Sequence, residues 1–89
     1  MLKFSNDIQV PVVCTQNNDG TAEVFVPDLN MKCYGEDFTD ALASTILKVS
    51  AIYYYNKERN IDLKFRTTYE DAMAICGKNS FVTFACISN

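Results

Sequence analysis

Alternation of apolar and polar residues opens the chain and predicts two strands joined by a tight turn. The alternation runs through residues 8–15 and returns through residues 21–26. The polar residues between the two runs end in Asp19 and Gly20, a dipeptide that is typical of short hairpin turns. A shorter alternation through residues 31–34 indicates a third strand. Three strands in close succession predict an antiparallel meander.

Apolar residues then recur at spacings of three and four, which predicts a long helix. We expect this helix to begin at Phe38 and to end between residues 57 and 60. Asp37 is the expected N-cap, and Asp40 at the third helical position completes a capping-box-like pair. The stripe that should face the core consists of Phe38, Ala41, Leu42, Thr45, Ile46, Val49, Ile52 and Tyr53.

A second, shorter helix and a final strand complete the pattern. Thr67 or Thr68 is the expected cap of this helix, and Gly77 is expected to end it. The apolar run through residues 81–87 predicts the fourth strand. The residues of the short helix that should face inward are Ala72, Met73, Ile75 and Cys76.

The predicted order of elements is β-β-β-α-(short α)-β, which indicates the α+β class. We expect one sheet with the helices packed on one of its faces. The last strand follows a long crossover, so it should lie beside the first strand and run parallel to it. The sequence of 89 residues contains no linker, repeat or low-complexity tract, so residues 1–89 are expected to form a single domain.

The charge balance favours a basic protein partner over a nucleic acid. The chain has 11 acidic and 8 basic residues and a net charge of −3 at pH 7. An acidic domain repels a phosphate backbone, so we expect no direct binding of nucleic acid. No apolar run has the length of a membrane span, and the first residues lack the hydrophobic region of a signal peptide. We therefore expect a cytoplasmic protein without membrane association.

The four cysteines indicate neither a metal site nor a catalytic thiol. They are Cys14, Cys33, Cys76 and Cys86, and the chain has no histidine. Zinc sites built from cysteine alone use closely spaced pairs, and a catalytic thiolate needs a histidine or a strongly positive setting. We expect reduced thiols, with Cys76 and Cys86 filling the core. Glu23 is the one acid inside a predicted strand, so a magnesium-dependent nuclease is not indicated either. We predict no cofactor, metal or catalytic activity.

Two short motifs lie at the exit from the second strand and at the entry to the long helix. The segment Val24-Phe25-Val26-Pro27-Asp28-Leu29 is followed by Gly35-Glu36-Asp37 and then by Asp40-Ala41-Leu42. This arrangement resembles the signature of the HicB-like antitoxins. In that family a Pro-Asp-Leu/Phe segment leads into Gly-Asp/Glu and then into Asp/Glu-Ala-Leu/Ile.

The resemblance extends along most of the chain. The family's opening strand, hairpin turn and closing strand are similar to Val10-Pro11-Val12-Val13, Asp19-Gly20 and Phe81-Val82-Thr83-Phe84. The family commonly has Pro-Gly-Cys where this chain has Asn30-Met31-Lys32-Cys33. Many members also carry a C-terminal DNA-binding segment that is missing here, so we expect no autorepression through such a domain. The resemblance implies a HicB-like fold, which for the family is a partial ribonuclease-H-like or ferredoxin-like α+β unit.

The resemblance also implies a non-catalytic function. HicB-like antitoxins bind HicA, a small mRNA-cleaving ribonuclease toxin, and cover its active site. HicA proteins are basic on their RNA-binding side, so an acidic surface can match them by charge. The residues expected to bind such a partner are Asp28, Glu36, Asp37, Asp40, Tyr54 and Tyr55.

Both groups of expected partner-binding residues have a second interpretation. The acids also suit turns and the start of a helix, where carboxylates accept backbone N–H groups. Tyr53, Tyr54 and Tyr55 span about 200° of a helix, so at least one ring leaves the core stripe, either for an interface or for an exposed helix end. We expect a homo-oligomer, since unpaired strand edges invite a second chain. The alternative function is a stand-alone oligomeric interaction or small-ligand-sensing module without a toxin partner.

Overall fold

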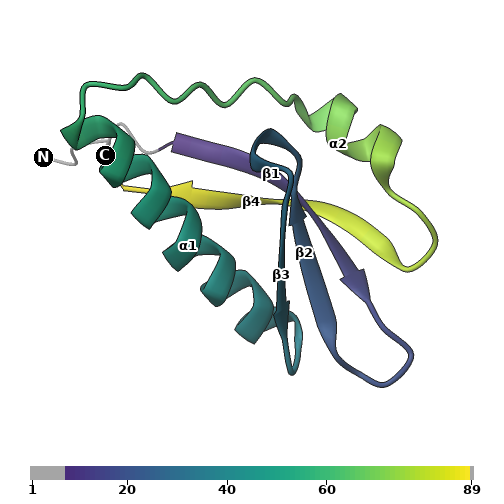
Figure 1. The fold of residues 1–89 in the computed structure, drawn as a ribbon. Helices are drawn as coiled ribbons and strands as arrows, with labels where there is room; N and C mark the ends of the chain where they lie inside the picture. The colour runs from purple at the N-terminus through teal and green to yellow at the C-terminus, as the bar shows by residue number, and fades with distance from the viewer. Residues whose placement is uncertain (1–7, 89) are drawn as a thin grey trace, which may run out of the picture.

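A four-stranded sheet with one helix on each side makes up the computed structural model, which describes residues 8–88 (Figure 1). The predicted strands and helices are confirmed close to their predicted bounds. The elements are β1 Ile8–Gln16, β2 Ala22–Val26, the 3-10 helix η1 Pro27–Leu29, β3 Met31–Gly35, α1 Phe38–Glu58, α2 Tyr69–Ile75 and β4 Ser80–Ile87.

The hairpin between β1 and β2 is held by side chains of its own turn. Asp19 Oδ1 accepts hydrogen bonds from the backbone N–H of Thr21 at 3.0 Å and from its hydroxyl at 2.6 Å. These bonds hold the pKa of the Asp19 carboxyl below its usual value. Gly20 adopts a φ of 91°, a conformation that glycine reaches without steric strain. The turn that Asp-Gly predicts therefore forms from local chemistry alone.

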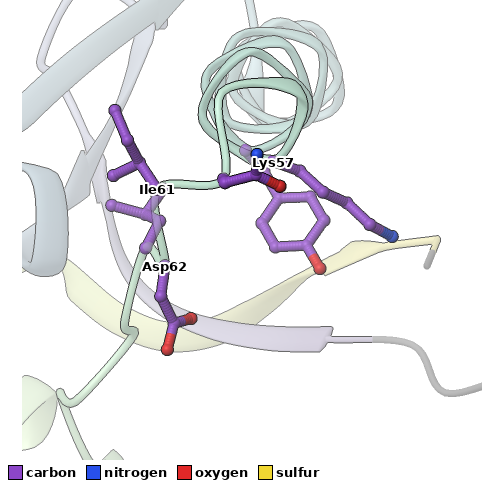
Figure 2. Close-up of a pocket in the computed structure, with 6 residues that line it drawn as sticks. Lys57, Ile61 and Asp62 are labelled. Atoms are coloured by element: carbon purple, nitrogen blue, oxygen red, sulfur yellow. The ribbon is translucent and has the colours of Figure 1, made fainter.

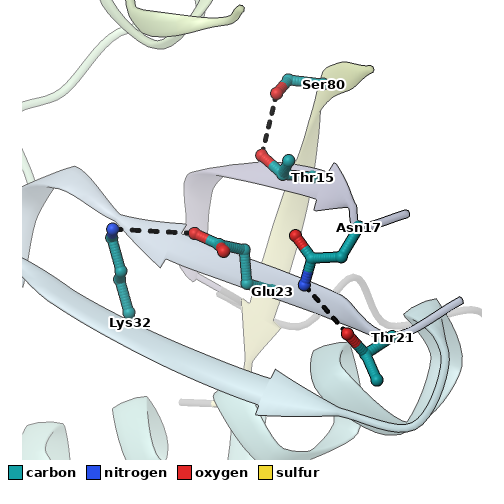
Figure 3. A network of polar contacts seen from close by, with 6 residues as sticks. All are labelled: Thr15, Asn17, Thr21, Glu23, Lys32 and Ser80. Atoms are coloured by element: carbon teal, nitrogen blue, oxygen red, sulfur yellow. Dashed lines mark hydrogen bonds and ion pairs between the residues drawn. The ribbon is translucent and has the colours of Figure 1, made fainter. Parts of the chain in front are cut away.

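Polar contacts near this turn join neighbouring strands (Figure 3). The hydroxyls of Thr15 in β1 and Ser80 in β4 lie 2.8 Å apart. Lys32 Nζ in β3 lies 3.7 Å from Glu23 Oε2 in β2. These contacts add side-chain links to the backbone ladders of two strand pairs, β1–β4 and β2–β3.

Both helices begin with the caps that the sequence predicts. Asp37 Oδ1 accepts the N–H of Asp40 at 2.8 Å, and Asp40 Oδ2 accepts that of Glu36 at 2.9 Å. Thr68 and Asp71 form a complete capping box at the start of α2, with both bonds at 3.1 Å. Each cap satisfies N–H groups that the first helical turn leaves without partners.

The direction of β4 differs from the prediction. The strand order is β3-β2-β1-β4, and every neighbouring pair is antiparallel. Ile8 pairs with Ile87 at one end of the β1–β4 ladder, and Thr15 pairs with Ser80 at the other. The expectation that the last strand runs parallel to the first is therefore wrong.

The route of the chain after α1 explains this antiparallel direction. The connector 59–68 passes η1, where Asp28 Oδ1 accepts the backbone N–H of Thr67 at 2.9 Å. The helix α2 then carries the chain along the sheet toward the end of β1, where Gln16 N–H donates to Asn79 O at 3.1 Å. Because β4 starts where β1 ends, it runs back against β1. The parallel prediction treated α1, the connector and α2 as a single crossover.

The two helices lie on opposite faces of the sheet, which corrects the expectation of helices on one face. Phe81 and Phe84 are three positions apart on β4, so they point to opposite faces. Phe81 contacts Phe38 of α1 with ring centroids 5.1 Å apart, whereas Phe84 stacks on Tyr69 of α2 at 6.2 Å. Residues 10–14 of β1 are consecutively buried because α1 covers one of its faces and α2 the other.

The main core lies between α1 and the sheet. Ala41, Thr45 and Val49 are the buried residues of α1, and all three belong to the predicted stripe. Thr45 is polar, but its hydroxyl donates to Ala41 O at 2.8 Å and is therefore satisfied. The buried residues of the sheet in this cluster are Val10, Val12, Cys14, Ala22, Val24, Val26, Ala85 and Ile87.

Three residues that were expected in the core are exposed instead. Met73 and Ile75 of α2 are 47% and 51% exposed, and Cys86 of β4 is also exposed. The short helix α2 buries Ala72, so its apolar neighbours on the helix surface remain uncovered. Cys86 lies on the α2 side of the sheet, two residues beyond the Phe84 ring that α2 covers.

Candidate functional site

Three exposed carboxylates mark the start of α1. Asp37 and Asp40 are fixed by the capping bonds described above, and Glu36 precedes them. None of the three forms an ion pair with a described basic side chain; the ion pairs among residues 8–88 include Lys32–Glu23 and Lys64–Asp62. The positive end of the helix dipole favours negative charge at this position. The arrangement leaves several carboxylate oxygens pointing to solvent, where a cationic surface can reach them.

At the C-terminal end of α1, the three consecutive tyrosines point in different directions. Tyr53 packs toward the core beside Phe65, with ring centroids 6.3 Å apart. Tyr54 is 39% exposed, and its hydroxyl donates to the backbone carbonyl of Ser88. Tyr55 is 56% exposed, and the Arg59 guanidinium lies 3.8 Å from its ring centroid. Two of the three rings therefore lie on the surface, as their angular spread predicts.

The structure adds Leu47 to these residues, which the sequence analysis missed. Leu47 is 73% exposed, halfway along α1. Asp40, Leu47 and Tyr54 are spaced by seven residues, so they lie along one side of the helix. The signal was present in the sequence, because Leu47 is a large apolar residue that falls outside the core stripe.

These residues define one continuous surface, which we call the α1 outer stripe. It consists of Asp40, Ala43, Leu47, Ala51 and Tyr54, all exposed, with Glu36, Asp37 and Tyr55 beside its ends. A helix rises 1.5 Å per residue, so the stripe is roughly 21 Å long from Asp40 to Tyr54. It is acidic at one end, apolar in the middle and aromatic at the other end.

Asp28 lies apart from this surface. Its Oδ1 accepts the backbone N–H groups of Arg66 at 2.8 Å and Thr67 at 2.9 Å, and its Oδ2 is buried. The carboxylate therefore holds the connector 59–68 against η1. Five of the six residues that the sequence analysis expected to bind a partner lie along or beside the α1 outer stripe, with the three acids at one end and the two tyrosines roughly 21 Å away at the other. Asp28 instead makes a structural contact.

A shallow pocket of about 340 Å³ lies at the C-terminal end of α1 (Figure 2). The side chains around it mix apolar, amide and charged groups, and most of them are exposed. They are Tyr53, Lys57, Asn60, Ile61, Asp62 and Leu63. The pocket is separate from the acidic end of the α1 outer stripe, at the opposite end of the same helix.

The four cysteines are free thiols in different environments. Cys14 and Cys33 are buried, Cys76 is half-buried and Cys86 is exposed. Burial raises the pKa of the Cys14 thiol to about 11, and the neighbouring Cys76 thiol adds to this effect. A thiol whose pKa is raised stays protonated and is a poor nucleophile at neutral pH.

The raised pKa of Cys14 predicts a loss of stability in alkaline solution. The unfolded thiol ionises near pH 9.0 and the folded thiol near pH 11, so the folded state retains the proton longer and becomes less stable as pH rises between these values. By pH 10 this effect should be on the order of 1 kcal/mol. We expect the difference in unfolding free energy between the wild type and Cys14→Ala, measured with urea, to shrink by that amount from pH 8 to pH 10. A constant difference would contradict the prediction.

Among residues 8–88, no group of three or more His, Cys, Asp or Glu side chains is arranged to hold a metal ion. Neither helix in this part of the chain is long and apolar enough to cross a lipid bilayer. Comparison with models of protein families, with curated proteins and with solved structures finds no match to this chain.

Proposed function

We propose that this chain is a non-catalytic antitoxin of the HicB type, which binds a basic HicA-type ribonuclease toxin through the α1 outer stripe and occludes its active site. The observation that carries the proposal is the set of exposed carboxylates of Glu36, Asp37 and Asp40, none of which is neutralised by a described basic side chain. The sequence motifs that resemble HicB-like antitoxins give the partner its identity.

Charge and apolar area have different parts in this proposal. Carboxylates at the N-terminal end of α1 attract a basic surface and speed its approach, with an effect that salt weakens. Leu47, Tyr54 and Tyr55 supply apolar and aromatic area that a partner can desolvate, which is the usual source of affinity in an interface. Occlusion requires no reactive group on this chain, because covering the toxin's RNA-binding side is sufficient to stop cleavage.

Variants on the stripe test the proposal directly. We expect a purified HicA-type toxin to form a complex with the wild type and to lose its RNA cleavage. Leu47→Asp should weaken the complex about 100-fold, because it places a charge at the apolar centre. Glu36→Lys should weaken it roughly tenfold and reduce its dependence on salt. Titration calorimetry and an RNA cleavage assay measure both effects.

A matched control separates specific contacts from overall charge. Glu70→Lys makes the same charge change as Glu36→Lys, but on the exposed surface of α2. It should bind the toxin as tightly as the wild type. The proposal fails if no complex forms, or if Leu47→Asp and Glu36→Lys bind no more weakly than Glu70→Lys.

A second candidate function is a stand-alone oligomeric interaction module. The exposed apolar side chains of Tyr69, Met73 and Ile75 on α2 favour it, together with Phe84 on β4. These side chains lie on the face of the sheet opposite α1. Self-association of the pure protein without binding to any basic toxin would favour this candidate over the first.

A further inference from the structure

Within the described part of the chain, the outer edge of β4 is a long and neutral strand edge. Within residues 8–88, β4 is the last strand of the sheet on one side, and no other described strand pairs with its outer edge. Its eight residues, Ser80–Ile87, include no charged residue and no proline. Native edge strands usually carry lysine, proline or a bulge, which prevent pairing with another chain. The other edge strand, β3, is shorter and carries Lys32.

The pattern of backbone hydrogen bonds shows which groups of β4 face outward. Gln16 N–H donates to Asn79 O at 3.1 Å, at the end of the β1–β4 ladder. Hydrogen-bonded pairs alternate along an antiparallel ladder, so the odd-numbered residues of β4 bond to β1. The N–H and C=O groups of Val82, Phe84 and Cys86 therefore point to the open edge. Pro11 fits this assignment, because it pairs with Phe84 at a position where β1 needs no N–H donor toward β4.

We propose that two copies of this chain pair through β4, antiparallel and about a twofold axis, so that the two sheets join into one. In such a pairing the outward N–H and C=O groups of Val82, Phe84 and Cys86 on each copy find partners on the other copy. An antiparallel edge is complementary to itself, because each copy offers the same alternation of donors and acceptors.

Charge repulsion between two copies is smallest when they meet through this edge. Identical chains carry identical charges, and here the net charge is −3. A symmetric contact through the acidic start of α1 would bring like charges together, which is unfavourable. The contact through β4 joins two neutral strands and avoids this repulsion.

Apolar side chains beside the edge add area to the contact. Phe84 is 38% exposed and Phe81 is 47% exposed, on opposite faces of β4. Tyr69 of α2, which stacks on Phe84, is 47% exposed. Two copies paired through β4 in this register have the twofold axis at Phe84, so the two Phe84 rings lie opposite each other on the α2 face of the joined sheet. Phe81 aligns with Ile87 of the second copy, on the α1 face. Backbone pairing gives the contact its geometry, and the rings give it buried apolar area.

A proline substitution at one outward position tests this interface. Cys86 is exposed, and its N–H points away from β1, so Cys86→Pro removes a donor from the open edge but none from the ladder within the chain. We expect the wild type and Cys86→Ala to sediment at twice the mass of one chain. Cys86→Pro should dissociate with a constant raised roughly 100-fold or more, while keeping the circular dichroism spectrum of the wild type.

Amide hydrogen exchange of the wild type gives a second measurement that needs no folded variant. The amides of Val82, Phe84 and Cys86 should exchange quickly in dilute protein and slowly in concentrated protein. The amides of Thr83 and Ala85, which bond to β1, should be protected at both concentrations. This alternation is specific to edge pairing.

Two results would overturn the proposal. One is a protein that stays monomeric at millimolar concentration, in which case the edge serves a different strand or none. The other is a dimer in which the three outward amides gain no protection, since it would use another surface. The proposal does not depend on toxin binding, because its contacts are the outward backbone groups of Val82, Phe84 and Cys86. The α1 outer stripe meets the end of β4 only where the Tyr54 hydroxyl donates to Ser88 O. Cys86→Pro should therefore bind the toxin as tightly as the wild type.

Discussion

Gly35→Ala is expected to destabilise the protein by roughly 3 kcal/mol or more. A Cβ atom at Gly35 would lie 2.8 Å from the Cα of Ala41 and 2.9 Å from the carbonyl carbon of Asp40, and it would also meet the backbone nitrogen of Ala41. These atoms belong to the backbone of α1 and cannot rotate away, so the first turn of the helix would have to move off the sheet. Urea unfolding followed by circular dichroism measures the loss.

Gly77→Ala is the matched control for Gly35→Ala. A Cβ atom at Gly77 would meet no heavy atom within 4 Å, beyond its chain neighbours. The substitution should change the unfolding free energy by less than about 0.5 kcal/mol. Equal unfolding midpoints for the two variants would show that α1 does not approach β3 as closely as the structure shows.

Asp28→Ala is expected to destabilise the protein by about 2 kcal/mol and to release the connector 59–68. The substitution removes the acceptor of two backbone N–H groups, those of Arg66 and Thr67. It also breaks a link between η1 and a segment far away in the sequence. Limited digestion with trypsin, which cuts after lysine and arginine, should cleave at Lys64 and Arg66 faster than in the wild type.

Two further variants show whether the Asp28 effect depends on its hydrogen bonds. Asp28→Asn keeps an oxygen at the same position and should retain most of the stability, within about 1 kcal/mol of the wild type. Asp62→Ala removes an exposed carboxylate that pairs with Lys64, and should have little effect on stability. If Asp28→Ala is no less stable than Asp62→Ala, the connector is held by other contacts.

The elements that the sequence predicts correctly are those set by neighbouring residues. The Asp19-Gly20 turn, the Asp37 cap and the threonine cap of α2, which the structure assigns to Thr68, each depend on atoms within four positions of one another. The core stripe of α1 is equally local, since its spacing repeats once per helical turn. These features form through interactions between residues close together in the sequence, so the sequence pattern alone predicts them.

The errors concern features that depend on the path of the chain through space. The direction of β4 and the face occupied by α2 follow from the connector 59–68, which has no periodic pattern to reveal that it rounds the end of the sheet. Met73, Ile75 and Cys86 were assigned to the core because they are apolar, yet α2 is too short to cover them.

The candidate site shows the same division. The exposure of Tyr54 and Tyr55 follows from their angles on the helix, and the exposure of Asp37 and Asp40 follows from their place at its start. The separation of Asp28 from them depends on a contact with residues 66 and 67, nearly forty positions later in the chain. No pattern in the residues around Asp28 predicts a contact with residues so distant in the sequence.

The pairing of β1 with β4 determines when the sheet can be completed during translation. Sixty-five positions separate Thr15 from Ser80, and every other strand emerges from the ribosome before β4 does. Until then β1 lacks its neighbouring strand on one side, although its residues 10–14 are all buried in the folded protein. Folding therefore finishes only after translation has delivered the last strand. In a nascent chain that stalls before residue 80, the apolar strand β1 would remain unpaired on one side and exposed. Such a chain is expected to bind chaperones.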